Sequence, residues 1–210
     1  MKLQFQHVGH HPGLTIVVSE SNHSDALPMV TELFMRGQAV RSDDQAAVLA
    51  AVVLLHEYIG DTIELPYPVG VSFAEAIRVL CPQTISIGPV NGDNRSPSTG
   101  EVDAICRRAL AEPRPQRVSE PGALTIEWHS DFVMASDVGM TSQNFAFGRV
   151  FTNATLVASE PLVDIAMALF AVGSRLGRLH VPSLQSRQPS PSLLRVSRAL
   201  DLVGVTLLGT

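Results

Sequence analysis

The tripeptide His-Ser-Asp occurs twice in this chain, at residues 23–25 and 129–131. Each copy follows a segment that begins with Pro-Gly and contains Leu-Thr-Ile. The resemblance continues downstream, where an apolar, helix-like segment that ends near Gly60 aligns without a gap with one that ends near Gly177. After each glycine come a short strand, a second helix and a β-branched strand. Self-similarity of this kind, with a period too long for a solenoid, predicts a tandem duplication.

The repeat also predicts the architecture. Each copy has the pattern of strand, helix, strand, helix and strand, so we expect an α/β fold of two tandem β-α-β-α-β half-domains related by a pseudo-twofold axis. The first unit covers residues 1–90 and the second covers residues 121–210. Residues 91–120 are rich in turn formers, which predicts a linker containing a short helix near residues 101–110.

Composition excludes several classes of protein. A chain of 210 residues that is 45% hydrophobic and 17% charged can bury a substantial core. Its net charge of -5 and its lack of a basic cluster exclude the usual nucleic-acid interface. The longest apolar run, residues 46–55, is about half the roughly 20 residues that a membrane helix needs. The first residues also lack the apolar region of a signal peptide, so we expect a cytoplasmic protein with no membrane partner.

The shortage of lysine narrows the enzyme classes. Lys2 is the only lysine, which argues against Schiff-base enzymes and against P-loop nucleotidases, because both need lysine at the site. No GxGxxG motif follows a strand, which removes the usual dinucleotide fingerprint. The use of arginine in place of lysine fits a GC-rich, bacterial genome.

The two triplets are the best candidates for catalytic residues. A pseudo-twofold axis would bring two imidazoles and two carboxylates around one pocket. That set suits general acid/base chemistry or a divalent metal such as zinc or iron, although the sequence does not identify a cofactor. The four residues are His23, Asp25, His129 and Asp131.

Two further residues are candidates for substrate binding. Glu127 lies two residues before the second triplet and adds a carboxylate to that half. Arg95 lies in the turn-rich segment between the halves, where a guanidinium group can hold a carboxylate or a phosphate. The segment around Arg95 is either a plain linker or a ligand loop at the end of a strand.

The triplets also have a structural interpretation. Ser and Asp directly after a strand are preferred helix N-caps, and Asp25 before Ala26 fits a helix start. His56 lies near a helix end, where a cationic imidazole is favoured by the helix dipole, and we assign it no catalytic role. The triplets are therefore either functional or simply caps that the duplication retained.

The functional hypothesis is an enzyme that acts on a small polar metabolite in a pocket between the two repeats. Hydrolase or lyase chemistry fits, because it needs neither lysine nor a dinucleotide. The alternative is a non-catalytic, homo-oligomeric assembly or binding protein whose triplets only cap helices. Self-association is expected in either case, because a chain with few charges and all-round apolar helices suits obligate interfaces.

Overall fold

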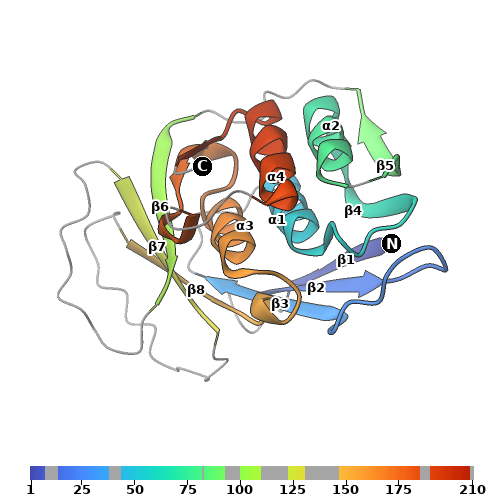
Figure 1. Cartoon of the computed structure of the whole chain (residues 1–210), viewed down its shortest axis with the longest axis horizontal. Coiled ribbons are helices and arrows are strands. Elements are labelled where there is room, and N and C mark those ends of the chain that lie inside the picture. Colours follow the sequence, from blue (N-terminus) through green and yellow to red (C-terminus); the bar gives the residue numbers. More distant parts are fainter. Residues whose placement is uncertain are drawn as a thin grey trace.

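The chain folds into one mixed β-sheet that curves around a group of four α-helices (Figure 1). This computed structural model describes residues 1–7, 14–37, 44–81, 83–92, 100–109, 123–130, 147–184 and 190–208. Within these residues the sheet has ten strands. The α/β class predicted from the sequence is confirmed.

The elements of the first half of the chain alternate after three initial strands. They are β1 (Lys2–His7), β2 (Leu14–Glu20), β3 (Glu32–Gly37), α1 (Asp44–Leu55), β4 (Thr62–Gly70), α2 (Val71–Leu80) and β5 (Ser86–Asn91).

The elements of the second half follow in a similar order. They are β6 (Val102–Arg108), β7 (Ala123–His129), β8 (Phe147–Thr152), α3 (Glu160–Val172), β9 (Leu176–His180), α4 (Pro191–Leu202) and β10 (Thr206–Leu208), with short 3-10 turns at residues 154–156, 173–175 and 182–184.

The strand order across the sheet is β10-β9-β6-β7-β8-β3-β2-β1-β4-β5. Strands β1, β2 and β3 pair antiparallel, and β3 pairs antiparallel with β8. The remaining pairs, β1 with β4, β4 with β5, and the run from β8 through β7, β6 and β9 to β10, are parallel. The two halves of the chain thus meet in the middle of the sheet, where β3 lies beside β8.

Helices α1 and α3 form the centre of the core. Every residue from Ala46 to Leu55 is at most 3% exposed, which agrees with the absence of charged residues from this stretch. In α3 the buried residues include the carboxyl-bearing Asp164. Full burial of each large aliphatic side chain contributes about 1.5–3 kcal/mol, so these two helices hold the sheet and the outer helices together.

The prediction of a short helix near residues 101–110 was wrong, because this segment forms strand β6. Ala104 and Cys106 are buried while Asp103 and Ile105 are more exposed, which is the two-residue period of a strand. Strand β6 lies between β7 and β9, and parallel pairing on both sides outweighs the helical preference of its alanine and arginines.

Strands β1, β3 and β8 were not predicted either. Three strands, rather than one, therefore come before the first helix of each half. Among the described residues, none of the helices combines the length and the apolar character that crossing a membrane requires.

Candidate functional site

A cavity of about 370 Å³ lies where α1 ends and where α3 and α4 begin. This volume is within the range of small-molecule sites. Its wall combines aliphatic side chains with hydroxyls, one imidazole and one carboxylate. The apolar lining is Leu54, Val157, Ala158, Leu162 and Leu193, and the polar lining is His56, Glu57, Thr155, Ser159, Ser190 and Ser192.

His56 reaches this cavity because α1 ends one residue before it. Its Nδ1 lies 2.8 Å from the carbonyl oxygen of Val53, and its Nε2 lies 2.7 Å from the hydroxyl of Ser192. A carbonyl oxygen can only accept, so Nδ1 carries the proton and Nε2 accepts from Ser192. This tautomer leaves Nε2 ready to take the serine proton.

The imidazole of His56 is neutral near physiological pH. Burial lowers its pKa, and this effect outweighs the hydrogen bond to Val53 and the nearby carboxylate of Glu57, which raise it. His56 is 1% exposed. The cationic imidazole expected at this helix end is therefore not present, because burial disfavours the charge more than the helix dipole favours it.

Ser192 is placed by the start of α4. The hydroxyl of Ser190 accepts from the backbone N–H of Leu193, and Pro191 follows at a position where proline is tolerated. Helix α3 also has a serine before it and a proline in its first turn, Ser159 and Pro161, but the Ser159 side chain forms no cap hydrogen bond. The N-termini of α3 and α4, each the positive end of a helix dipole, therefore both lie at the cavity. We call the cavity, His56 and Ser192 the pocket site.

A second buried polar group lies deeper, between α3 and the sheet. Asp164 accepts hydrogen bonds from the indole N–H of Trp128 at 2.5 Å and from the hydroxyl of Ser183 at 2.6 Å. Burial raises the pKa of Asp164 to about 6, against the lowering effect of those two hydrogen bonds. We call these three residues the Asp164 cluster. None of them lines the cavity.

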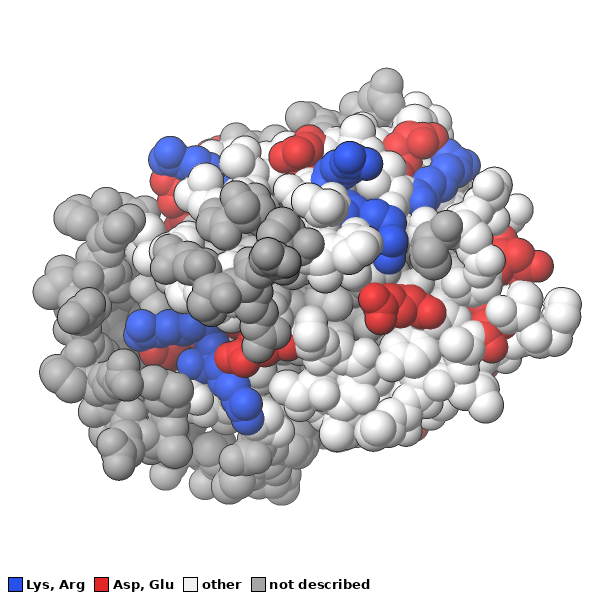
Figure 2. All heavy atoms as spheres, in the orientation of Figure 1, with Lys and Arg blue, Asp and Glu red and all other residues white. Residues whose placement is uncertain are grey.

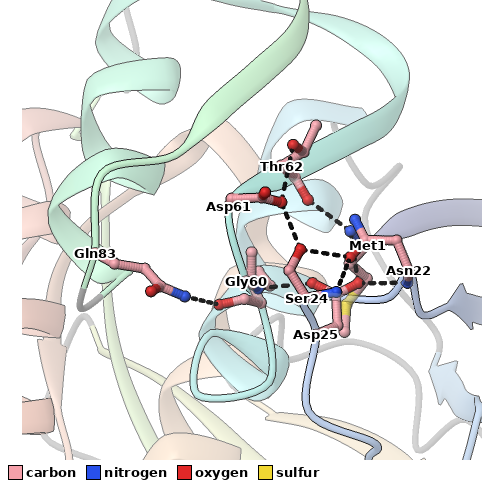
Figure 3. A network of polar contacts seen from close by, with 9 residues as sticks. Met1, Asn22, Ser24, Asp25, Gly60, Asp61, Thr62 and Gln83 are labelled. Carbon is pink, nitrogen blue, oxygen red and sulfur yellow. Dashed lines mark hydrogen bonds and ion pairs between the residues drawn. The ribbon is translucent and has the colours of Figure 1, made fainter.

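The first His-Ser-Asp triplet lies in the turn after β2. Figure 3 shows the polar contacts of two of its residues, Ser24 and Asp25. Asp25 accepts from the backbone N–H groups of Asn22 at 2.7 Å and Gly60 at 2.6 Å, and it pairs with the amino group of Met1 at 2.7 Å. Burial raises the pKa of Asp25, but these hydrogen bonds outweigh it and hold the pKa below its ordinary value.

The expected helix cap at Asp25 is not formed, because no helix begins there. The N–H of Ala26 donates to the carbonyl of Tyr58, and Pro28 has no N–H to contribute to a helix. The turn instead packs on Gly60, where an added Cβ would lie 2.5 Å from the carbonyl oxygen of Ser24. Asp25 thus ties the turn to the segment that follows α1.

The second triplet has different surroundings. The ring of His129 stacks on Phe151 with centroids 5.0 Å apart, and Ser130 accepts from Arg108. Glu127 forms an ion pair with Arg107 of β6 at 2.8 Å. Asp131 and Arg95, the other two candidates, lie outside the described residues.

The strand register does not bring His23 and His129 together. His129 is opposite Phe151, Phe151 is opposite Arg36, and Arg36 is opposite Leu14, the first residue of β2. His23 lies beyond the other end of β2, and a strand of 7 residues spans about 20 Å. The part of the chain that the structure describes also contains no group of three or more His, Cys, Asp and Glu side chains suited to a metal ion.

Sequence reasoning did not find the pocket site. His56 was visible as a polar residue at the end of an apolar helix, but its partner Ser192 lies 136 residues away. Ser192 directly follows the Ser/Pro-rich sequence of residues 186–191, and no motif marks it. The packing of α4 against α2, and of α2 against α1, brings the two residues together.

Comparison of the chain with protein-family models, with curated proteins and with solved structures found no match.

Proposed function

We propose that this protein is a hydrolase that cleaves an acyl bond of a small polar metabolite in the pocket site. Ser192 acts as the nucleophile and His56 as the general base. The observation that carries the proposal is the 2.7 Å hydrogen bond between the Ser192 hydroxyl and Nε2 of His56 at the wall of a substrate-sized cavity. A hydroxyl paired with a correctly protonated imidazole is the usual device for activating serine.

The reaction proceeds in two stages. The Ser192 oxygen attacks the acyl carbon of the substrate while its proton moves to Nε2 of His56. The tetrahedral intermediate collapses, the leaving group takes that proton, and an acyl-serine remains. Water then attacks the acyl-serine and gives a proton to His56, which returns it to Ser192 as the carboxylic acid departs. Atoms and charge balance with water as the only co-reactant.

Two features of the site support these roles. The carbonyl of Val53 holds the imidazole through Nδ1, in the position that a carboxylate occupies in a Ser-His-Asp triad. The N-termini of α3 and α4 direct positive dipole ends at the cavity, where negative charge develops on the substrate oxygen. A carbonyl stabilises the imidazolium less than a carboxylate does, so we expect a modest turnover number.

The same proposal includes the duplication. We infer that residues 1–90 and 121–210 descend from one unit related by a pseudo-twofold axis. In support, the order β3-β2-β1-β4-β5 in one half corresponds to β8-β7-β6-β9-β10 in the other. The strands that carry the triplets depart from this correspondence, since β2 runs antiparallel to its neighbours and β7 runs parallel to its neighbours. The pocket site would then lie between the repeats, because His56 belongs to the first and Ser192 to the second.

We further propose that the protein works in the cytoplasm on a small molecule rather than on nucleic acid. On the face drawn in Figure 2, the described basic side chains lie near acidic ones and do not form a continuous positive surface. Phosphate-backbone binding needs such a surface.

The direct test is hydrolysis of short-chain 4-nitrophenyl esters by the wild type and by His56→Gln. We expect steady turnover that falls by about a hundredfold or more in the variant, because general base catalysis contributes on the order of 10²–10⁴-fold. Thr155→Val, which removes a lining hydroxyl without touching either residue, is the control and is expected to stay within about threefold of wild type. Equal rates in wild type and His56→Gln would overturn the proposal.

A second candidate function is homo-oligomeric assembly. The turn after β2 displays two large apolar side chains to solvent, with Leu27 81% and Met29 77% exposed. Contiguous exposed apolar side chains mark interaction surfaces, and these two lie two residues apart on one turn. If the protein assembles through this turn, the double variant Leu27→Ser, Met29→Ser will lower the mass measured by light scattering, while an unchanged mass would exclude the turn as the interface.

A further inference from the structure

The pocket site contains a charged residue that the proposed chemistry does not use. Glu57 follows His56 in the turn after α1, and its carboxylate oxygen lies 3.9 Å from Nε2 of His56. Among the described residues that line the cavity, Glu57 is the one with an ionised side chain, because His56 is neutral. A substrate held at Ser192 would lie close to this carboxylate, because the Ser192 hydroxyl and the Glu57 carboxylate are both near Nε2 of His56.

Glu57 has no evident structural role. Its side chain is 61% exposed, and the one ion pair that the described residues give it is the long contact with the uncharged His56. It also lies just beyond the C-terminal end of α1, where the helix dipole disfavours a negative charge. A residue whose side chain does not stabilise the fold at its position is a candidate for a functional role.

One described cation, Arg195 of α4, lies near enough to the pocket site to act on His56. Its Nε, however, donates to the carbonyl of Leu80 at the end of α2. Arg195 is also absent from the cavity wall. Among the described residues of the cavity wall the charged group is therefore the Glu57 carboxylate, and the rest of the lining is aliphatic side chains, hydroxyls and the neutral imidazole.

We propose that Glu57 determines specificity, and that the substrate is an ester or thioester of a small cationic alcohol or thiol. The acyl group lies against the aliphatic wall formed by Leu54, Leu162 and Leu193, and the cation of the leaving group lies beside Glu57. This inference rests on the proposed function, because it assigns a substrate class to the same site.

The experiment compares two substrates of equal shape, acetylthiocholine and its neutral isostere S-(3,3-dimethylbutyl) thioacetate. We expect wild type to favour the cation by about fivefold in kcat/KM, as suits a partly exposed ion pair. Glu57→Gln should remove that preference while leaving the rate on the neutral thioester within about twofold. The control Glu64→Gln, at an exposed glutamate of β4, should keep the preference.

Three outcomes separate the two proposals. Equal rates on both thioesters in wild type, or a preference that survives in Glu57→Gln, would overturn the role of Glu57 and leave the hydrolase intact. Absence of hydrolysis above the level of Ser192→Ala would overturn the hydrolase. In that case a binding measurement by NMR chemical shifts still tests Glu57, which should favour choline over 3,3-dimethyl-1-butanol in wild type alone; equal binding would reject its role as well.

Discussion

Two buried polar groups lie close to α3, and they differ in what surrounds them. The pocket site and the Asp164 cluster each combine a titratable side chain, a serine hydroxyl and a third hydrogen-bonding group. His56 and Ser192 line a cavity, whereas Asp164 is enclosed between α3, Trp128 and Ser183. Both His56 and Asp164 are 1% exposed, so burial alone does not distinguish them.

This difference in surroundings separates a buried polar group that can take part in a reaction from one that stabilises the fold. A hydroxyl on a cavity wall is accessible to a substrate and to water. The carboxyl of Asp164 is buried and already accepts from an indole N–H and a hydroxyl, and these hydrogen bonds fix the position of α3 against β7 and the turn at residues 182–184. We therefore assign reactivity to Ser192 and a structural role to Ser183.

The largest expected effect is on catalysis. Ser192→Ala should lower kcat for thioester hydrolysis by about 10³-fold, because it removes the nucleophile. Ser183→Ala, the matched loss of a hydroxyl from the other cluster, should leave kcat within about threefold. Steady-state kinetics of the two variants measure kcat. Equal losses of kcat in both would show that the assignment of different roles to Ser192 and Ser183 is wrong.

The second largest effect is on stability, and here the Asp164 cluster should be more sensitive to substitution than the pocket site. Asp164→Ala leaves the indole N–H of Trp128 and the hydroxyl of Ser183 without an acceptor, which should lower the free energy of unfolding by about 2–4 kcal/mol. Ser192→Ala should lower it by less than about 1 kcal/mol, because water in the cavity can hydrogen bond to His56. Urea titration followed by the fluorescence of Trp128, the chain's single tryptophan, measures both. A larger loss in Ser192→Ala than in Asp164→Ala would reverse the assignment.

The contributions of Asp164 and His56 to the free energy of unfolding should also change with pH in opposite directions. The folded protein holds a proton on Asp164 between pH 3.8 and about 6, where the unfolded chain has released it, so this carboxyl's contribution to stability falls as pH rises through that window. At about 1.4 kcal/mol for each pKa unit, the change amounts to roughly 3 kcal/mol. The lowered pKa of His56 has the opposite effect. As the pH falls below the pKa of free histidine, this histidine takes up a proton in the unfolded chain but not in the folded protein, so stability falls.

Unfolding free energies at pH 4.5 and pH 7.5 separate these contributions. Asp164→Asn should be more stable than wild type at pH 7.5 and close to it at pH 4.5, because asparagine can keep both hydrogen bonds without a buried charge. If the difference in unfolding free energy between Asp164→Asn and wild type were the same at both pH values, the carboxyl of Asp164 would not titrate in the folded protein over this range.

The smallest expected effect concerns the first triplet. His23 is exposed in the turn after β2, and His23→Ala should change stability by less than about 0.5 kcal/mol and leave thioester hydrolysis unaffected. Asp25→Asn, two residues away, should destabilise clearly, because Asp25 holds two backbone N–H groups and the amino group of Met1. Thermal unfolding and kcat of both variants test this contrast. A large loss of kcat in His23→Ala would restore a catalytic role to the triplet.

Much of the fold could be predicted from the sequence because its signals are local. The uninterrupted apolar run before His56 and the Ser-Glu-Pro start of α3 mark two buried helices wherever they pack. Strand β6 could not be predicted, because its two-residue period becomes decisive only between β7 and β9. Strands β1, β3 and β8 likewise depend on partners distant in the sequence.

The candidate site was less predictable than the fold. The repeated triplets were a real sequence signal, but Asp25 and His129 occupy different surroundings, one tied to Gly60 and the other stacked on Phe151. Identical tripeptides therefore do not guarantee identical contacts. The pocket site depends on the contact between the segment after α1 and the first turn of α4, which no local pattern encodes.

The most direct measurement is the mass of the protein after reaction with a fluorophosphonate, which forms a covalent bond only with an activated serine. We expect one adduct per chain, mapped to Ser192 by peptide mass spectrometry and abolished in His56→Gln, while Ser183 stays unmodified. Failure of Ser192 to react, or equal labelling in His56→Gln, would contradict the claim that His56 activates Ser192.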